Sequence, residues 1–209
     1  MVRIGILVGS TRPQRRGLAV ARWVCEAARR HPAAAAGEVT FELVDLADYR
    51  LPLLDEPVPA AIGDYRNAHT ERWAQTVAGF DGFVLVTPEY NHSVPAALKN
   101  AIDFLFTEWN DKAAGFVSYG LNGGVRAVEH LRLSLAEVKV ACVRSQVALS
   151  LFSDFEFADI SEPGICTPAE HHEPIVHRML DEVIAWAGAL KPLRQPSGAA
   201  DPQPEPART

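Results

Sequence analysis

Two polar loops in this 209-residue chain each follow a short apolar run and precede a helical pattern. The first, residues 9–17 (GSTRPQRRG), carries three arginines beside a serine and a threonine. Backbone N–H groups at a helix N-terminus, hydroxyls and guanidinium groups together favour a phosphate dianion. The glycine fingerprints of dinucleotide and P-loop sites are both missing, which argues against a pyrophosphate here. The loop predicts a monophosphate cradle; the alternative is a simple helix cap with solvated arginines.

The second loop, residues 87–95 (TPEYNHSVP), has the properties of a platform for a flat heterocycle. Pro88 fixes the chain as it leaves the apolar run, the backbone through Asn91 can lie against a ring, and Tyr90 offers an aromatic face or a hydroxyl. A third loop, residues 118–127 (SYGLNGGVRA), has glycines that permit close backbone approach. By itself the second loop is also a plausible capped turn. Together the three loops predict a site for flavin mononucleotide (FMN).

Apolar runs and amphipathic stretches alternate along the chain, and these elements must position the loops. The apolar runs are nearly continuous, as strands are when helices cover both faces of a parallel sheet. We expect a doubly wound α/β three-layer sandwich. Ligand loops after strands one and three favour the flavodoxin-like order 2-1-3-4-5, whose switch point those strands flank. The expected strands are 2–8, 39–45, 82–87, 113–119 and 140–149, and the expected helices are 17–30, 67–78, 94–108, 124–137 and 169–189.

Composition narrows the class of protein. A net charge of -6 argues against attraction to nucleic acid or to an anionic membrane. Three cysteines without CxxC spacing support neither a disulfide framework nor a zinc site, so we expect a cytoplasmic protein. No apolar run approaches the ~18 residues of a membrane span, and Met1 leads directly into a strand, so neither an anchor nor an export signal is expected. His92 in the second loop and the adjacent pair His171 and His172 lack a partner at ligand spacing, so no metal is predicted.

The length predicts one domain over residues 1–190, followed by a proline-rich tail over 191–209 that we expect to be mobile. A long connection, residues 46–66, lies outside the alternation, and connections of this length usually cover a site or meet a partner. The helix at 94–109 carries more apolar surface than one core face requires. It predicts an interface between copies of the chain, and the alternative is a helix that is simply well buried.

The three motifs, residues 9–17, 87–104 and 118–127, resemble the NADPH-dependent FMN reductase family, whose fold is flavodoxin-like, and the resemblance spans most of residues 2–190. Carried over residue by residue, it implies FMN phosphate contacts at Ser10, Arg12, Gln14, Arg15 and Arg16. It implies contacts with the isoalloxazine at Pro88, Glu89, Tyr90 and Asn91, and on the ring's other side at Ser118, Tyr119 and Gly120. Many relatives have a serine or a glycine where this chain has Gln14 and Arg15.

The resemblance also implies an activity, namely ping-pong transfer from NADPH or NADH through FMN to a small-molecule acceptor such as a quinone, an azo compound, a metal ion or a free flavin. No catalytic side chain is expected, because the flavin carries the chemistry. Relatives form homodimers or homotetramers. The alternative is a flavodoxin-type carrier or redox-responsive binding protein that holds FMN without using nicotinamide; such carriers are usually more acidic and build their phosphate loops from Ser and Thr. A third possibility is a flavin-free α/β binding module.

Overall fold

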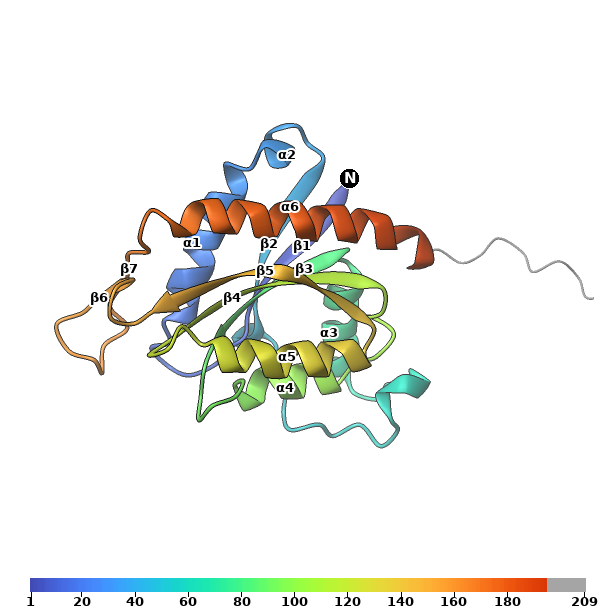
Figure 1. Ribbon diagram of the computed structural model, residues 1–209. Helices are drawn as coiled ribbons and strands as arrows, with labels where there is room; N and C mark the ends of the chain where they lie inside the picture. The colour runs from blue at the N-terminus through green and yellow to red at the C-terminus, as the bar shows by residue number, and fades with distance from the viewer. Residues whose placement is uncertain (195–209) are drawn as a thin grey trace, which may run out of the picture.

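A computed structural model describes residues 1–194, so most of the predicted tail, residues 195–209, lies outside the described residues. Its centre is a sheet of five parallel strands in the order β2-β1-β3-β4-β5, which confirms the predicted flavodoxin-like order (Figure 1). Every residue of the central strand β3 is buried, as expected for a strand covered on both faces. The strands are β1 (Val2–Val8), β2 (Val39–Asp45), β3 (Gly82–Pro88), β4 (Lys112–Gly120) and β5 (Val140–Ser150).

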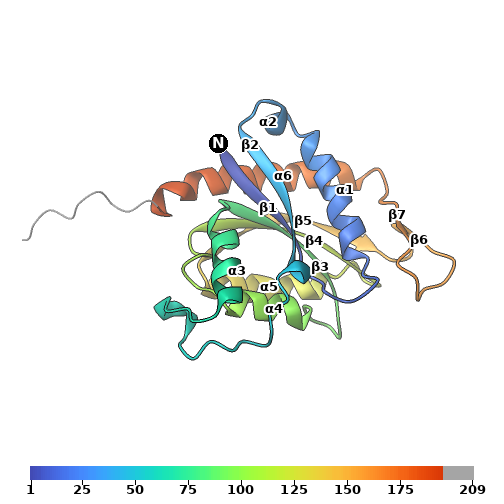
Figure 2. The same ribbon diagram turned by 180° about the vertical axis from the view of Figure 1, so that it is seen from behind.

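Helices cover both faces of this sheet, as the two opposite views show (Figures 1 and 2). One face carries α1 (Gly17–Arg29) and α6 (His172–Leu190), and the other carries α3 (Ala68–Ala78), α4 (Ala96–Asp103) and α5 (Val125–Glu137). Each face has its own cluster of buried apolar residues, so the core has two halves separated by the sheet. The short elements are α2 (Pro32–Ala35), η1 (Leu46–Asp48), η2 (Ala60–Ile62), η3 (Lys191–Arg194), β6 (Phe155–Glu156) and β7 (Ile165–Cys166).

Helix α4 is shorter than the helix predicted for residues 94–108, because it ends at Asp103 and the chain continues in turns. Those turns place Phe104, Leu105 and Trp109 in the core with at most 1% of each residue exposed. On the helix itself, Leu98 and its buried neighbours also face the core. The apolar surplus that suggested an interface is therefore used inside the protein, and the oligomeric state stays a prediction.

The structure describes the first four residues of the predicted tail. Residues 191–194 form η3, and two of their cations bind Asp81, which precedes β3. Lys191 Nζ lies 2.9 Å from one carboxylate oxygen of Asp81, and Arg194 Nη2 lies 2.5 Å from the other. Asp81 also accepts the backbone N–H of Arg3 at 2.9 Å. This end of the sheet is thus held by residues that sequence reasoning assigned to the tail.

A buried lysine begins β4, at the edge of the sheet opposite the three loops. Lys112 is 2% exposed, and its Nζ donates to the carbonyl of Val77 at 2.5 Å and lies 5.7 Å from the ring centroid of Phe83. Burial, followed by the positive charge of Arg194, lowers the pKa of Lys112 from 10.5 to about 7. The folded state therefore disfavours the protonated amine.

This shift predicts how stability depends on pH. Between about pH 7 and 10.5 the unfolded chain keeps a proton on Lys112 that the folded protein has lost, so the free energy of unfolding rises with pH. Relative to Lys112→Met, the wild type should gain stability across this range, by at most about 1.4 kcal/mol per pH unit. Urea denaturation of both proteins at a series of pH values measures the difference, in which other titrating groups cancel. A difference that stays constant with pH contradicts the prediction.

Candidate functional site

The loop between β1 and α1 has backbone N–H groups that lack a hydrogen-bond acceptor among the described residues. Gly9 N–H donates to the carbonyl of Val86 on β3 at 2.8 Å, which fixes the start of the loop. From Ser10 to Arg16, no backbone N–H has a protein acceptor among residues 1–194, and no side chain caps α1. These N–H groups lie where the dipole of α1 favours negative charge, so the loop fits the phosphate that the sequence predicts.

The arginines of this loop differ in what they bind. Arg12 is exposed and, among the described residues, has no hydrogen-bond or ion-pair partner. Arg15 forms an ion pair with Asp45 at the end of β2, and both side chains are largely buried. Arg16 Nη2 donates to two backbone carbonyls of the β6–β7 hairpin, residues 155–166. Gln14 is exposed and adopts a left-handed backbone conformation, with φ 55°. Arg12 is therefore the cation of this loop that has no partner among the described residues.

The loop after β3 is a tight hairpin turn. Tyr90 and Ser93 exchange backbone hydrogen bonds of 2.9 and 3.0 Å, and the two residues between them, Asn91 and His92, have φ of 48° and 71°. Positive φ at both central positions is the signature of a type I′ turn. The turn holds the backbone of Asn91 in one conformation at the surface, as a platform requires.

A side-chain hydrogen bond joins the first two loops. Ser10 Oγ lies 2.9 Å from the hydroxyl of Tyr90, and Ser10 is fully buried. Immediately before the turn, Glu89 forms an ion pair with Arg126 at the start of α5 and accepts the Arg126 backbone N–H at 3.2 Å. Burial alone would raise the pKa of Glu89, but the hydrogen bond and charge of Arg126 outweigh it and hold that pKa below its ordinary value. Glu89 is thus a charged anchor rather than a proton donor near neutral pH.

The third loop is closed by Ser118, whose side chain the resemblance had placed beside the ring. Its Oγ donates to the carbonyl of Gly123 at 2.6 Å and is fully buried. Gly124 has φ 69°, and a Cβ there would lie 2.9 Å from backbone atoms of Tyr119, so only glycine fits without strain. Ser118 therefore shapes the turn, while its neighbour Tyr119 reaches the site itself. A Cβ at Gly17 would lie 2.8 Å from the Tyr119 hydroxyl, so this ring packs against the start of α1.

One cavity brings most of the predicted residues together. Leu151, which follows β5, also lines it and was missed; its N–H donates to the carbonyl of Gly120 at 3.1 Å. Its place in the sequence could have revealed it, because Leu151 directly follows β5 and so lies at the same edge of the sheet as the three loops. The predicted residues that line the cavity are Arg12, Arg16, Pro88, Glu89, Tyr90, Tyr119 and Gly120. Those that lie outside its lining are Ser10, Gln14, Arg15, Asn91 and Ser118.

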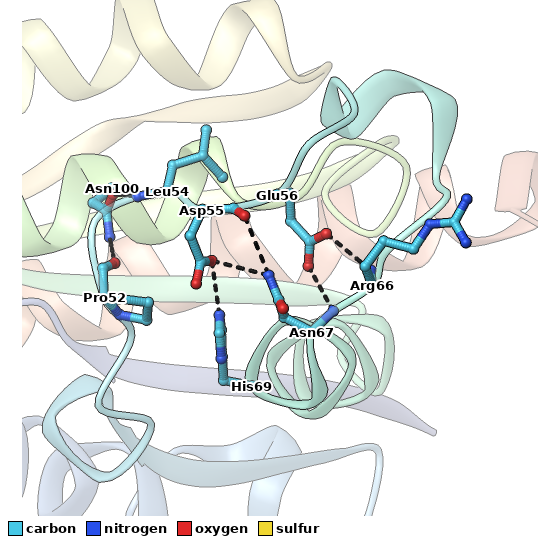
Figure 3. A network of polar contacts seen from close by, with 8 residues as sticks. All are labelled: Pro52, Leu54, Asp55, Glu56, Arg66, Asn67, His69 and Asn100. Carbon is cyan, nitrogen blue, oxygen red and sulfur yellow. Dashed lines mark hydrogen bonds and ion pairs between the residues drawn. The ribbon is translucent and has the colours of Figure 1, made fainter.

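The long connection over residues 46–66 lies beside the first loop. With Thr11 and Ala97 it lines a second cavity on the α4 side of the loop. Figure 3 shows how polar contacts hold the connection. Asn100 of α4 accepts the N–H of Leu54 at 3.0 Å, and the carboxylate of Glu56 accepts two backbone N–H groups at the start of α3. The connection is thus a fixed wall next to the predicted cradle.

A family model described as NADPH-dependent FMN reductase matches residues 2–154, which include all three loops. The chain belongs to this family. An NAD(P)H-dependent FMN reductase of Schizosaccharomyces pombe is 36% identical over 165 residues, which cover 78% of this chain and 80% of that protein. A quinone reductase of Pseudomonas putida is 32% identical over 166 residues, covering 72% of this chain and 81% of that protein.

Among solved structures, the flavoenzyme FerB, an NAD(P)H:(acceptor) oxidoreductase from Paracoccus denitrificans, has a similar fold. The TM-score is 0.67 at 21% identity, and the match covers 90% of this chain and 98% of FerB. As a member of the NADPH-dependent FMN reductase family, the protein is an oxidoreductase that uses FMN and NAD(P)H. The open N–H groups and the free guanidinium of the first loop fit this cofactor. Among residues 1–194, no helix is both long and apolar enough to cross a membrane.

The hydrogen bond between the first two loops can be tested without ligand. Tyr90→Phe leaves the hydroxyl of Ser10 buried without this partner, so it should lower the free energy of unfolding by about 1 kcal/mol. Tyr49→Phe, which removes a 2.9 Å bond to Thr76 away from the site, is the matched control. Urea denaturation measures both. We expect only Tyr90→Phe to increase amide exchange in the 90–93 turn, and equal exchange in both variants would contradict the link.

Proposed function

We propose that this protein catalyses NAD(P)H oxidation in a ping-pong sequence, with the nicotinamide and then a small flat acceptor using one site in turn. The observation that carries the proposal is one cavity at the carboxyl edge of the sheet, where the arginine-rich loop, the Tyr90 turn and the third loop meet. Bound FMN would supply the hydride chemistry. The chain's own residues hold that group, orient it and leave one face accessible.

Each loop has a distinct part in this proposal. Arg12 and the open N–H groups of the first loop bind the phosphate. The backbone amides at Asn91 and Gly120 would contact the ring and, as fixed dipoles do, would stabilise negative charge on it. Glu89 stays ionised and holds α5 through Arg126. Burial raises the pKa of Tyr119, so its hydroxyl remains protonated and can donate a hydrogen bond.

The acceptor that fits best is a flat aromatic molecule, such as a quinone or an azo compound. The lining of the cavity includes the apolar or aromatic residues Pro88, Tyr90, Tyr119 and Leu151. Two relatives are named for these substrates, the quinone reductase of Pseudomonas putida and an NADPH azoreductase of a Bacillus species, the latter 30% identical over 161 residues. A metal ion as acceptor would make no use of this apolar lining.

We also propose that the protein works in the cytoplasm as a homodimer or homotetramer. The three cysteines are free thiols in the structure, as a reducing compartment requires. Support for an interface comes from the connection over residues 46–66, where Leu53 is 82% exposed and Leu54 is 48% exposed.

Turnover distinguishes this function from that of an FMN carrier. The purified protein, loaded with FMN, should consume NADPH or NADH steadily when a quinone is supplied, and double-reciprocal plots at several quinone concentrations should be parallel, as ping-pong transfer requires. Intersecting lines would contradict a shared site. A protein that keeps FMN but shows no nicotinamide-dependent turnover would be a carrier or a redox-responsive binding protein.

The phosphate cradle can be tested by removing its free cation. Arg12→Ala should weaken FMN binding by about tenfold or more, because a charge-assisted contact with the phosphate is lost. Riboflavin, which lacks the phosphate, should bind the variant and the wild type equally. Arg22→Ala, on the exposed side of α1, is the matched control for loss of one positive charge. Fluorescence titration measures all affinities, and undiminished FMN binding by Arg12→Ala would refute the cradle.

A further inference from the structure

The β6–β7 hairpin begins just beyond the stretch that matches the family model, which ends at residue 154. Strand pairing and hydrogen bonds to a buried carboxylate hold its base in place. Phe155 pairs with Cys166 in the two-stranded ladder, and Asp154, which is 1% exposed, accepts the N–H groups of Ser150 at 2.8 Å and Ala169 at 3.0 Å. Gly164, with φ 68°, closes the far end, where a Cβ would lie 2.6 Å from the carbonyl oxygen of Glu156. The hairpin is therefore a defined element of this chain, placed beside the cavity.

Arg16 connects the hairpin to the first loop. Its Nη2 donates to the carbonyl of Ile160 at 2.8 Å and to that of Glu162 at 2.6 Å, and its guanidinium carbon lies 4.9 Å from the ring centroid of Phe157. Only 9% of Arg16 is exposed. Three contacts from one hairpin, two carbonyls and one aromatic ring, restrict a side chain that is otherwise among the most flexible.

The same side chain also has a donor that the protein does not use. Arg16 Nε is buried and has no hydrogen-bond partner among the described residues, although Arg16 lines the cavity. A buried N–H without an acceptor is costly, and native proteins seldom leave one unexplained. A phosphate oxygen in the adjacent cradle would satisfy it. The hairpin thus holds one edge of the guanidinium while another edge stays available.

We propose that Phe157 is a positioning residue for FMN binding, which acts by holding Arg16 in the orientation that meets the phosphate. This inference rests on the proposed place of the phosphate in the first loop. The aromatic face and the two hairpin carbonyls fix the guanidinium before the cofactor arrives, so less side-chain entropy is lost on binding. Because coupling between two events is reciprocal, bound FMN also stabilises the docked hairpin.

The decisive comparison is between FMN and riboflavin, which share the ring but differ in the phosphate. Phe157→Leu keeps apolar packing against the core but removes the aromatic face, so it should weaken FMN binding about five- to tenfold and leave riboflavin binding unchanged. Phe157→Tyr retains the face and should restore FMN affinity. Phe152→Ala, in the same connection and 80% exposed, is the matched control and should bind both ligands as the wild type does. Fluorescence titration measures each affinity.

Hydrogen exchange gives an independent measurement. FMN should slow exchange of the amides of residues 157–164 in the wild type and in Phe157→Tyr, but much less in Phe157→Leu, and riboflavin should slow it in none of them. Equal losses of FMN and riboflavin affinity in Phe157→Leu, or hairpin exchange that does not respond to FMN, would overturn the inference. A wild type that binds FMN and riboflavin equally would instead refute the proposed cradle. Absence of NADPH turnover would refute the proposed function and leave this inference standing.

Discussion

The parallel pairing of β1 with β3 is the constraint on which the site depends. Val8 lies opposite Val86 in this ladder, and the next N–H, that of Gly9, donates to the Val86 carbonyl. Residues about 80 positions apart in sequence therefore leave the sheet side by side, and the Ser10–Tyr90 hydrogen bond follows from that placement. A parallel ladder also sends both chains onward in the same direction, so the open donors at the start of α1 and the rigid turn at Asn91 share one edge.

The sequence predicted the sheet well because its signals are local. Each buried strand is a short apolar run between turn residues, and the loops after β1 and β3 carry distinctive motifs. The end of α4 was not predictable in this way. Apolar residues continue past Asp103, and only tertiary packing decides that Phe104 and Trp109 enter the core from turns rather than from a longer helix. Periodicity cannot distinguish a residue buried from a helix from one buried from the turn that follows it.

Within the site, residue types were easier to foresee than partners. Three arginines in one loop indicate an anion, but their sequence does not say that Arg15 binds Asp45 and that Arg16 binds a hairpin 144 residues away. Those partners come from other elements, and each removes a guanidinium from general solvent exposure. Pro88 and Tyr119, which were expected to contact the ring, line the cavity, whereas the side chain of Ser118 bonds to its own loop. Tertiary structure thus decides what each cation of this loop binds: Arg15 pairs with Asp45, Arg16 is held by the hairpin beside the cavity, and Arg12 has no partner among the described residues.

Asp81 has a consequence for the order in which the molecule can be completed. It joins the beginnings of β1 and β3, and the cations that face it, Lys191 and Arg194, come more than a hundred residues later. As the chain leaves the ribosome, the first three strands can meet while this carboxylate still lacks its counter-charges. The ion pairs of Asp81 with Lys191 and Arg194 therefore form late, after the loops that are expected to hold the cofactor have been synthesised.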